Sequence, residues 1–73
     1  MTQMTDTIRI MVNGEAREIG AGSHVTDLLD MLGLHPGMVV VEHNREILER
    51  AHLAVAAVRE GDVFEVVHFV GGG

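Results

Sequence analysis

The chain has 73 residues, 47% of them apolar, and a formal charge of −6 from eleven acidic residues against five arginines. This length predicts one domain over residues 1–73, with a small core, because such a chain buries only about 60% of the surface that it exposes when unfolded. The acidic surface excludes nucleic acid and anionic membrane as natural partners and favours a protein with a basic face.

Residues 1–6 are polar and lack the basic-then-apolar order of a secretory signal, so we expect a disordered lead before the folded domain. No apolar run reaches the roughly 18 residues that a membrane-spanning helix needs. The chain has no cysteine, which excludes a disulfide framework and thiol chemistry. These features predict a soluble, cytoplasmic protein.

The first folded segment is predicted to be a β-hairpin. Apolar and other residues alternate over Thr7–Val12, which is the period of a strand with one buried face. Asn13-Gly14 readily supplies the positive φ angles of a two-residue type I′ turn, so the chain should return over Glu15–Ile19. The expected pairs across the hairpin are Val12 with Glu15, Ile10 with Arg17, and Ile8 with Ile19.

A helix is predicted next, ending at Leu32. It should start within Ser23–Thr26, where Ser23 and Thr26 are both capable N-caps. One face carries an apolar stripe at positions i, i+3, i+4 and i+7, formed by Val25, Leu28, Leu29 and Leu32. Gly33 is expected to terminate the helix, with Leu34 folding back onto its last turn.

Three further strands are predicted from apolar and β-branched runs. Their expected ranges are Met38–Glu42, Glu46–Leu48 and Val63–Val70, with turns at His43-Asn44-Arg45 and Glu60-Gly61-Asp62. Residues 49–58 have a weak pattern that leaves a helical turn, a short strand and a packed loop all open.

The order ββαβββ predicts an α+β protein of the β-grasp (ubiquitin-like) class, with a mixed sheet of four to five strands packed on one α-helix. In this class the first and last strands are parallel neighbours at the centre of the sheet. The nearly continuous apolar run Val63–Val70 favours a central strand, buried at least partly on both faces. A small sheet-and-helix domain with another strand order is the alternative.

Side chains alone give no case for an active site. The sequence lacks the H-E-x-x-H zinc motif and the G-x-x-x-x-G-K-[ST] phosphate loop. Its five histidines are scattered without metal-ligand spacing. We therefore predict neither catalytic nor metal-binding residues within this chain.

The glycine tail Gly71-Gly72-Gly73 is the exception, because it directly follows the expected central strand. Without Cβ atoms, such an arm of roughly 10 Å can thread a narrow channel and present a terminal carboxylate to another enzyme. Once that carboxylate is activated as an acyl-adenylate, a sulfur nucleophile can displace AMP and leave a thiocarboxylate. Gly72 and Gly73 therefore suit a carboxylate that another enzyme must grip and modify. A frayed or inert end is the alternative.

From Ile8 to Gly73 the chain resembles the ThiS family, the sulfur carriers of thiamine biosynthesis. The matching stretches are Val12-Asn13-Gly14-Glu15, Val25–Leu29, Val39–Asn44, Ile47, Arg50, Glu60-Gly61-Asp62 and Val70–Gly73. Each stretch is weak alone, but together, in this order and with this terminus, they are specific. The chain departs from the family in residues 1–6 and in Leu53, where many members have an aromatic residue.

The resemblance implies a protein co-substrate rather than an enzyme, with no bound cofactor. A ThiF-type adenylyltransferase would adenylate Gly73 with ATP and magnesium, and a donor such as a cysteine desulfurase would supply sulfur. Gly73 would then carry the sulfur, and Gly71 and Gly72 would thread the partner's active site. A ThiG-type thiazole synthase would then receive that sulfur for the thiazole ring. We expect a monomer when the chain is free, and a docking surface around the last strand that includes His68, Phe69 and Arg50.

Three other functions stay open at this point. The small subunit of molybdopterin synthase is also a β-grasp protein with a Gly-Gly tail, but it often has a proline close to the tail, and the one proline here is Pro36. A ubiquitin-like modifier would begin with the same activation of its tail. A plain interaction module would leave the tail inert.

Overall fold

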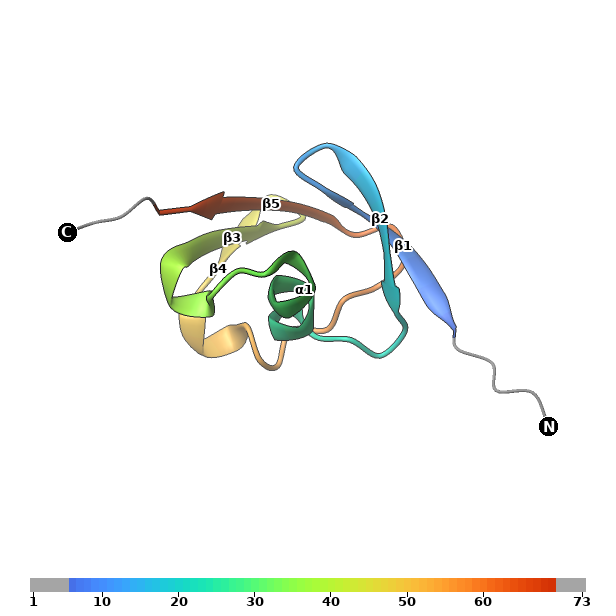
Figure 1. The fold of residues 1–73 in the computed structure, drawn as a ribbon, viewed down its shortest axis with the longest axis horizontal. Coiled ribbons are helices and arrows are strands. Elements are labelled where there is room, and N and C mark those ends of the chain that lie inside the picture. The colour runs from blue at the N-terminus through green and yellow to red at the C-terminus, as the bar shows by residue number, and fades with distance from the viewer. Residues whose placement is uncertain (1–5, 70–73) are drawn as a thin grey trace.

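The computed structural model describes residues 6–69, which form a five-stranded sheet with one α-helix on one face (Figure 1). The elements in chain order are β1 (Thr7–Val12), β2 (Glu15–Gly20), α1 (Val25–Leu32), the 3₁₀ helix η1 (Pro36–Met38), β3 (Val39–His43), β4 (Glu46–Leu48), the 3₁₀ helix η2 (Arg50–His52) and β5 (Val63–His68). The strand order is β2-β1-β5-β3-β4, with β1 and β5 parallel. This arrangement confirms the β-grasp prediction.

The first hairpin has the predicted turn and register. Asn13 and Gly14 have φ angles of 51° and 82°, as a type I′ turn requires. Val12 lies opposite Glu15, and the remaining predicted pairs are also present. The apolar side chains Ile10, Val12 and Ile19 are buried, so the alternation in the sequence did mark the core face.

Helix α1 starts within the predicted range Ser23–Thr26, but His24 occupies the N-cap position rather than Ser23 or Thr26. The Ser23 hydroxyl donates instead to a carbonyl in the preceding turn, at 2.7 Å. The carboxylate of Asp27 accepts the backbone N–H of His24 at 2.8 Å, which is one half of a capping box.

Residues 49–58 explain why α1 needs no Ser or Thr cap. They form η2 and a packed loop, in which Leu53 is only 3% exposed. The backbone N–H groups of Val25 and Thr26 donate to the carbonyls of Ala56 and Leu53, at 3.0 and 3.2 Å. The loop thereby satisfies donors that a side-chain cap would otherwise serve.

The end of α1 is as predicted. Gly33 has a φ of 75°, and its N–H donates to the carbonyl of Asp30 at 3.0 Å. The N–H of Leu34 reaches back to the carbonyl of Leu29 at 2.9 Å. These two bonds make a Schellman motif, and Leu34 packs against the core.

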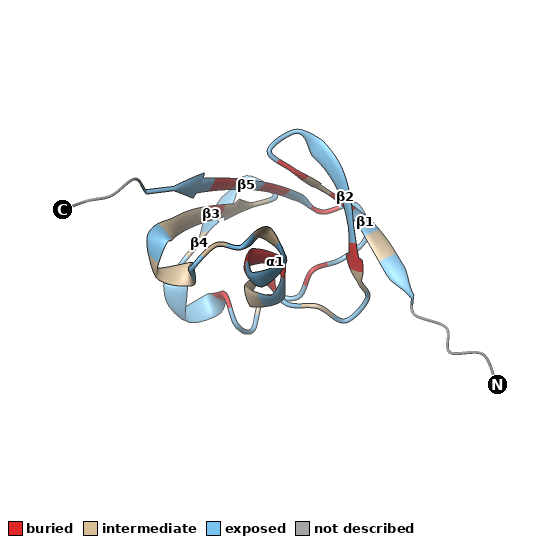
Figure 2. Cartoon of the chain, in the orientation of Figure 1, coloured by how far each residue is buried: buried red, intermediate tan, exposed pale blue. Residues whose placement is uncertain are grey.

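Strand β5 is central, but it is buried on one face only. Phe64 and Val66 are buried, whereas Val63, Glu65 and Val67 are exposed (Figure 2). The prediction of burial on both faces was wrong, because α1 covers one side of the sheet and the apolar side chains of β5 lie on both sides.

The boundaries of three strands also differ from the prediction. Strand β2 continues to Gly20, one residue beyond the predicted end at Ile19. Strand β3 begins at Val39 rather than Met38, because Met38 ends η1, and it continues to His43, which pairs with Glu46. Strand β5 ends at His68, and Val70 lies outside the described residues.

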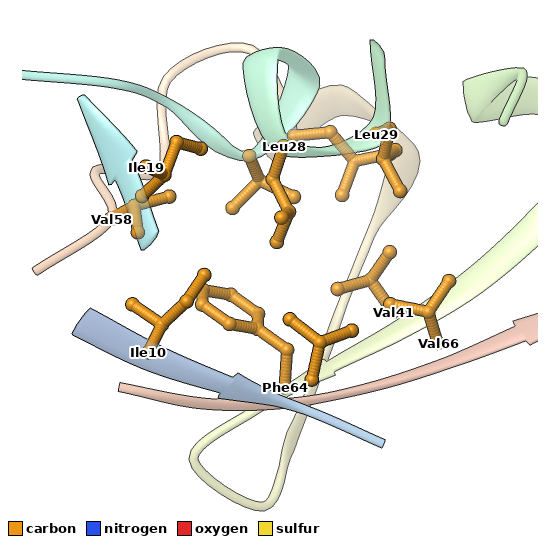
Figure 3. Close-up of a cluster of buried hydrophobic side chains, with 11 residues drawn as sticks. Ile10, Ile19, Leu28, Leu29, Val41, Val58, Phe64 and Val66 are labelled. Atoms are coloured by element: carbon orange, nitrogen blue, oxygen red, sulfur yellow. The ribbon is translucent and has the colours of Figure 1, made fainter. Parts of the chain in front are cut away.

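The core lies between α1 and the sheet (Figure 3). Its largest fully buried side chains are Phe64, Ile10, Leu28, Leu29, Val25 and Val41. They come from β5, β1, α1 and β3, so the strand that leads toward the glycine tail shares one core with the helix and with both of its neighbouring strands.

Candidate functional site

The predicted sulfur-carrying residue Gly73 and the tail residues Gly71 and Gly72 lie outside the described residues. The described part of the chain ends just after β5, so the candidate site is the surface around that end. We call this region the tail base and define it by Gly37, Met38, Arg50, His68 and Phe69.

A backbone contact anchors the last described residue. The N–H of Phe69 donates to the carbonyl of Met38 at 2.8 Å, one step beyond the pair formed by His68 and Val39. The Phe69 side chain is nevertheless 48% exposed, and His68 is exposed as well. A fixed backbone with an exposed phenyl ring suits contact with a protein partner.

Arg50 reaches the same region from η2. Its Nη2 donates to the carbonyl of Gly37 at 3.4 Å, and the N–H of Gly37 donates to Nδ1 of His35 at 2.9 Å. Gly37 directly precedes Met38, whose carbonyl holds Phe69. The structure therefore brings Arg50 and Phe69, far apart in sequence, to one end of the molecule; their role in docking stays a prediction.

Two asparagines that the sequence marked only as turn residues also hold β5. The side-chain amide of Asn13 accepts the N–H of Val66 at 2.7 Å and donates to the Val66 carbonyl at 3.2 Å. Asn44, with a φ of 50°, accepts the N–H of Val63 at 2.8 Å. The sequence offered one signal of this role. Asparagine stands at both turn positions, although glycine would adopt the same positive φ angles.

Asp62, which is only 8% exposed, fixes the turn before β5. Its carboxylate accepts hydrogen bonds from the Arg59 N–H at 2.8 Å, from Asn44 Nδ2 at 3.1 Å and from His43 Nε2 at 2.9 Å. Burial acts to raise the pKa of Asp62, but these bonds together hold the pKa below its ordinary value. The His43 ring also stacks on Phe64, with centroids 4.6 Å apart. The contacts of Asp62 and His43 stabilise the turn before β5, and this structural role accounts for the cluster.

Within residues 6–69, no group of three histidine or acidic side chains is placed to hold a metal ion. No helix in the same stretch is long and apolar enough to cross a membrane. A shallow hollow lies on the first hairpin, lined by Arg9, Ala16, Arg17 and Glu18, and it includes no residue of the tail base.

The fold defines the class of protein. A designed protein based on human erythrocytic ubiquitin matches 93% of this chain and 96% of its own, with a TM-score of 0.56 and 22% identity. The molecule is thus a ubiquitin-like β-grasp protein. The sequence profile of the ThiS family matches residues 10–73, and the chain belongs to that family.

Solved structures agree with this assignment. The crystal structure of the thiamine biosynthesis protein ThiS from Geobacter metallireducens matches with a TM-score of 0.76 and 35% identity. The match covers 90% of this chain and 100% of the Geobacter chain.

Curated relatives are of two kinds. The sulfur carrier protein ThiS of Bacillus subtilis is 41% identical over 49 residues, which is 67% of this chain and 74% of that protein. Thiazole synthases of Paramagnetospirillum magneticum and Magnetococcus marinus are 41% and 39% identical over 66 residues. Those 66 residues are 90% of this chain, which spans only 20% of the length of each synthase.

Proposed function

We propose that this chain is a sulfur carrier of thiamine biosynthesis and that the carboxylate of Gly73 carries the sulfur. The observation that carries the proposal is the ThiS family match over residues 10–73, which includes the glycine tail. The packing of β5 supports it, because a rigid domain can present a short arm to successive enzymes. The chain then acts as a co-substrate, and its partners supply the catalytic groups.

Loading takes two steps. The Gly73 carboxylate attacks the α-phosphate of ATP and pyrophosphate leaves, while magnesium held by the partner offsets the phosphate charge. Hydrosulfide then attacks the carbonyl of the acyl-adenylate, AMP leaves, and a thiocarboxylate remains. Gly71 and Gly72 add no side chains around that carbonyl, which keeps it open to attack inside a narrow channel.

The proposed partners follow from these steps. A ThiF-type adenylyltransferase activates the tail, a cysteine desulfurase forms a persulfide from which a thiol reductant releases hydrosulfide, and a ThiG-type thiazole synthase receives the sulfur. The last partner is supported by the two thiazole synthases, because a fifth of their length resembles this chain.

The tail base is the proposed contact region, with Arg50, His68 and Phe69 nearest the partner. Phe69→Ala should weaken binding without unfolding the domain, because the ring is 48% exposed. An unchanged affinity in a folded variant would count against this contact.

The intact mass of the chain tests the proposed function. The chain is incubated with ATP, magnesium, a ThiF-type enzyme shown to load a known carrier, and sulfide. We expect a mass increase equal to the exchange of one oxygen for one sulfur, and no increase when Gly73 is deleted. If the intact chain gains no sulfur while the known carrier does, the proposal is refuted.

A further inference from the structure

The face of the sheet opposite α1 carries a pair of carboxylates. Phe64 and Val66 of β5 point toward the helix (Figure 3), so the alternating residues Glu65 and Val67 point to the other side. On the neighbouring strand β3, Glu42 lies directly opposite Glu65, and Val40 lies opposite Val67. We call these residues, together with Ile47 beside Glu42 on β4, the outer face.

The pairing of Glu42 with Glu65 disfavours the isolated fold. Like charges directly opposite each other on antiparallel strands repel. No ion pair among residues 6–69 involves either carboxylate, so neither is directly paired with a cation within the described part of the chain. A pair of this kind is compensated when a cation from another molecule lies between the two carboxylates.

Apolar side chains surround the acidic pair and lead toward the tail base. Ile47 is 68% exposed, Val67 is 59% exposed and Phe69 is 48% exposed. Exposed apolar groups rimmed by charge are typical of protein interaction sites. The outer face is continuous with the tail base through β5, where Val67 is two residues from Phe69.

We propose that the outer face docks against an apolar protein surface that carries a basic side chain, and that this side chain binds between Glu42 and Glu65. The inference rests on the proposed function, since the occupant is the thiazole synthase that receives the sulfur; two thiazole synthases contain a segment that resembles this chain. A guanidinium group fits best, because its donors can serve two carboxylates at once. Docking then relieves a repulsion that the free domain carries.

The test combines affinity with stability. Glu42→Gln and Glu65→Gln are compared with the parent chain for binding to the thiazole synthase and for unfolding in urea. Each variant should bind about tenfold more weakly and lose part of the salt dependence of binding. Each should also unfold at a higher urea concentration, because the repulsion is gone. Ile47→Ser should weaken binding without raising the urea concentration at which the domain unfolds.

Glu46→Gln is the matched control, because Glu46 is an exposed acid on the helix side of the sheet, opposite His43. It should change the affinity little. If the two outer-face variants bind as well as the parent while the parent is still loaded with sulfur, the docking proposal fails and the carrier function stands. If the parent is neither bound nor loaded, both fail.

Discussion

The side chain of Asn13 provides the sharpest test of how β5 is held. Strand β1 ends at Val12, yet the Asn13 amide accepts from the N–H and donates to the carbonyl of Val66, at 2.7 and 3.2 Å. The side chain therefore continues the β1 ladder beyond the end of the strand. Asn13→Gly keeps a residue suited to the φ angle of 51° and removes only these two bonds.

The expected cost follows from those two bonds. Each contributes about 0.5–1.5 kcal/mol net, so the free energy of unfolding should fall by about 1–3 kcal/mol. For a domain of this size, each kcal/mol lowers Tm by about 4–8 °C. Urea unfolding followed by circular dichroism measures the loss.

Amide hydrogen exchange locates the effect. The Val66 N–H should exchange much faster in Asn13→Gly, whereas the Phe69 N–H, bonded to the Met38 carbonyl at 2.8 Å, should change only as far as global stability does. A variant with unchanged stability and an equally protected Val66 amide would refute the reasoning.

Three further predictions concern single side chains. The folded pKa of Asp62 is lowered, so its contribution to stability is present above the ordinary value of about 3.9 and is lost as the pH falls through the folded value. The unfolding free energy of Asp62→Asn should therefore depend less on pH as the pH falls below the ordinary pKa, and an equally steep curve would contradict this. Leu28→Ala should cost about 2–5 kcal/mol in urea unfolding, because Leu28 is fully buried, while the exposed control Met31→Ala should cost under about 0.5 kcal/mol. In Gly37→Ala the new Cβ would lie 3.1 Å from the His35 ring, so the ring must shift and the bond between Gly37 N–H and His35 should weaken, at a cost of up to about 1.5 kcal/mol. The same urea assay on His35→Ala and on the double variant checks this, since Gly37→Ala should cost less once the ring is absent.

Local patterns predicted much of the fold. Asn13-Gly14 fixed both the turn and the register of the first hairpin, because a two-residue loop leaves one pairing that buries Ile8, Ile10 and Ile19 together. Gly33 marked the helix end for a similar reason, since its positive φ is required by hydrogen bonds within the last turn. In both places the decisive contacts lie within a few residues of the signal.

The errors arose where distant contacts decide. His24 caps α1 because Leu53 and Ala56 supply carbonyls from almost thirty residues away, and nothing near Ser23 reveals this. Val67 looked like a core residue, yet it faces away from α1. Its exposure could not be read from an apolar run, because such a run fits a strand buried on both faces equally well.

The candidate site was predictable only in part. The glycine tail stood out by composition, and its chemistry stays a proposal. The neighbourhood of Arg50 was not predictable, because it depends on the path of η1 and on a bond to the Gly37 carbonyl. The acidic pair needed the register of β3 against β5, which brings Glu42 beside Glu65.

The central position of β5 also has a mechanical meaning. A partner that draws in the chain beyond Phe69 pulls along the axis of a strand that is hydrogen-bonded to β1 on one side and β3 on the other. Such a load shears many backbone bonds together, whereas the same pull on an edge hairpin would open them one after another. Asn13 adds two bonds on the β1 side that share this load. The domain can therefore stay folded while its end is drawn into an active site.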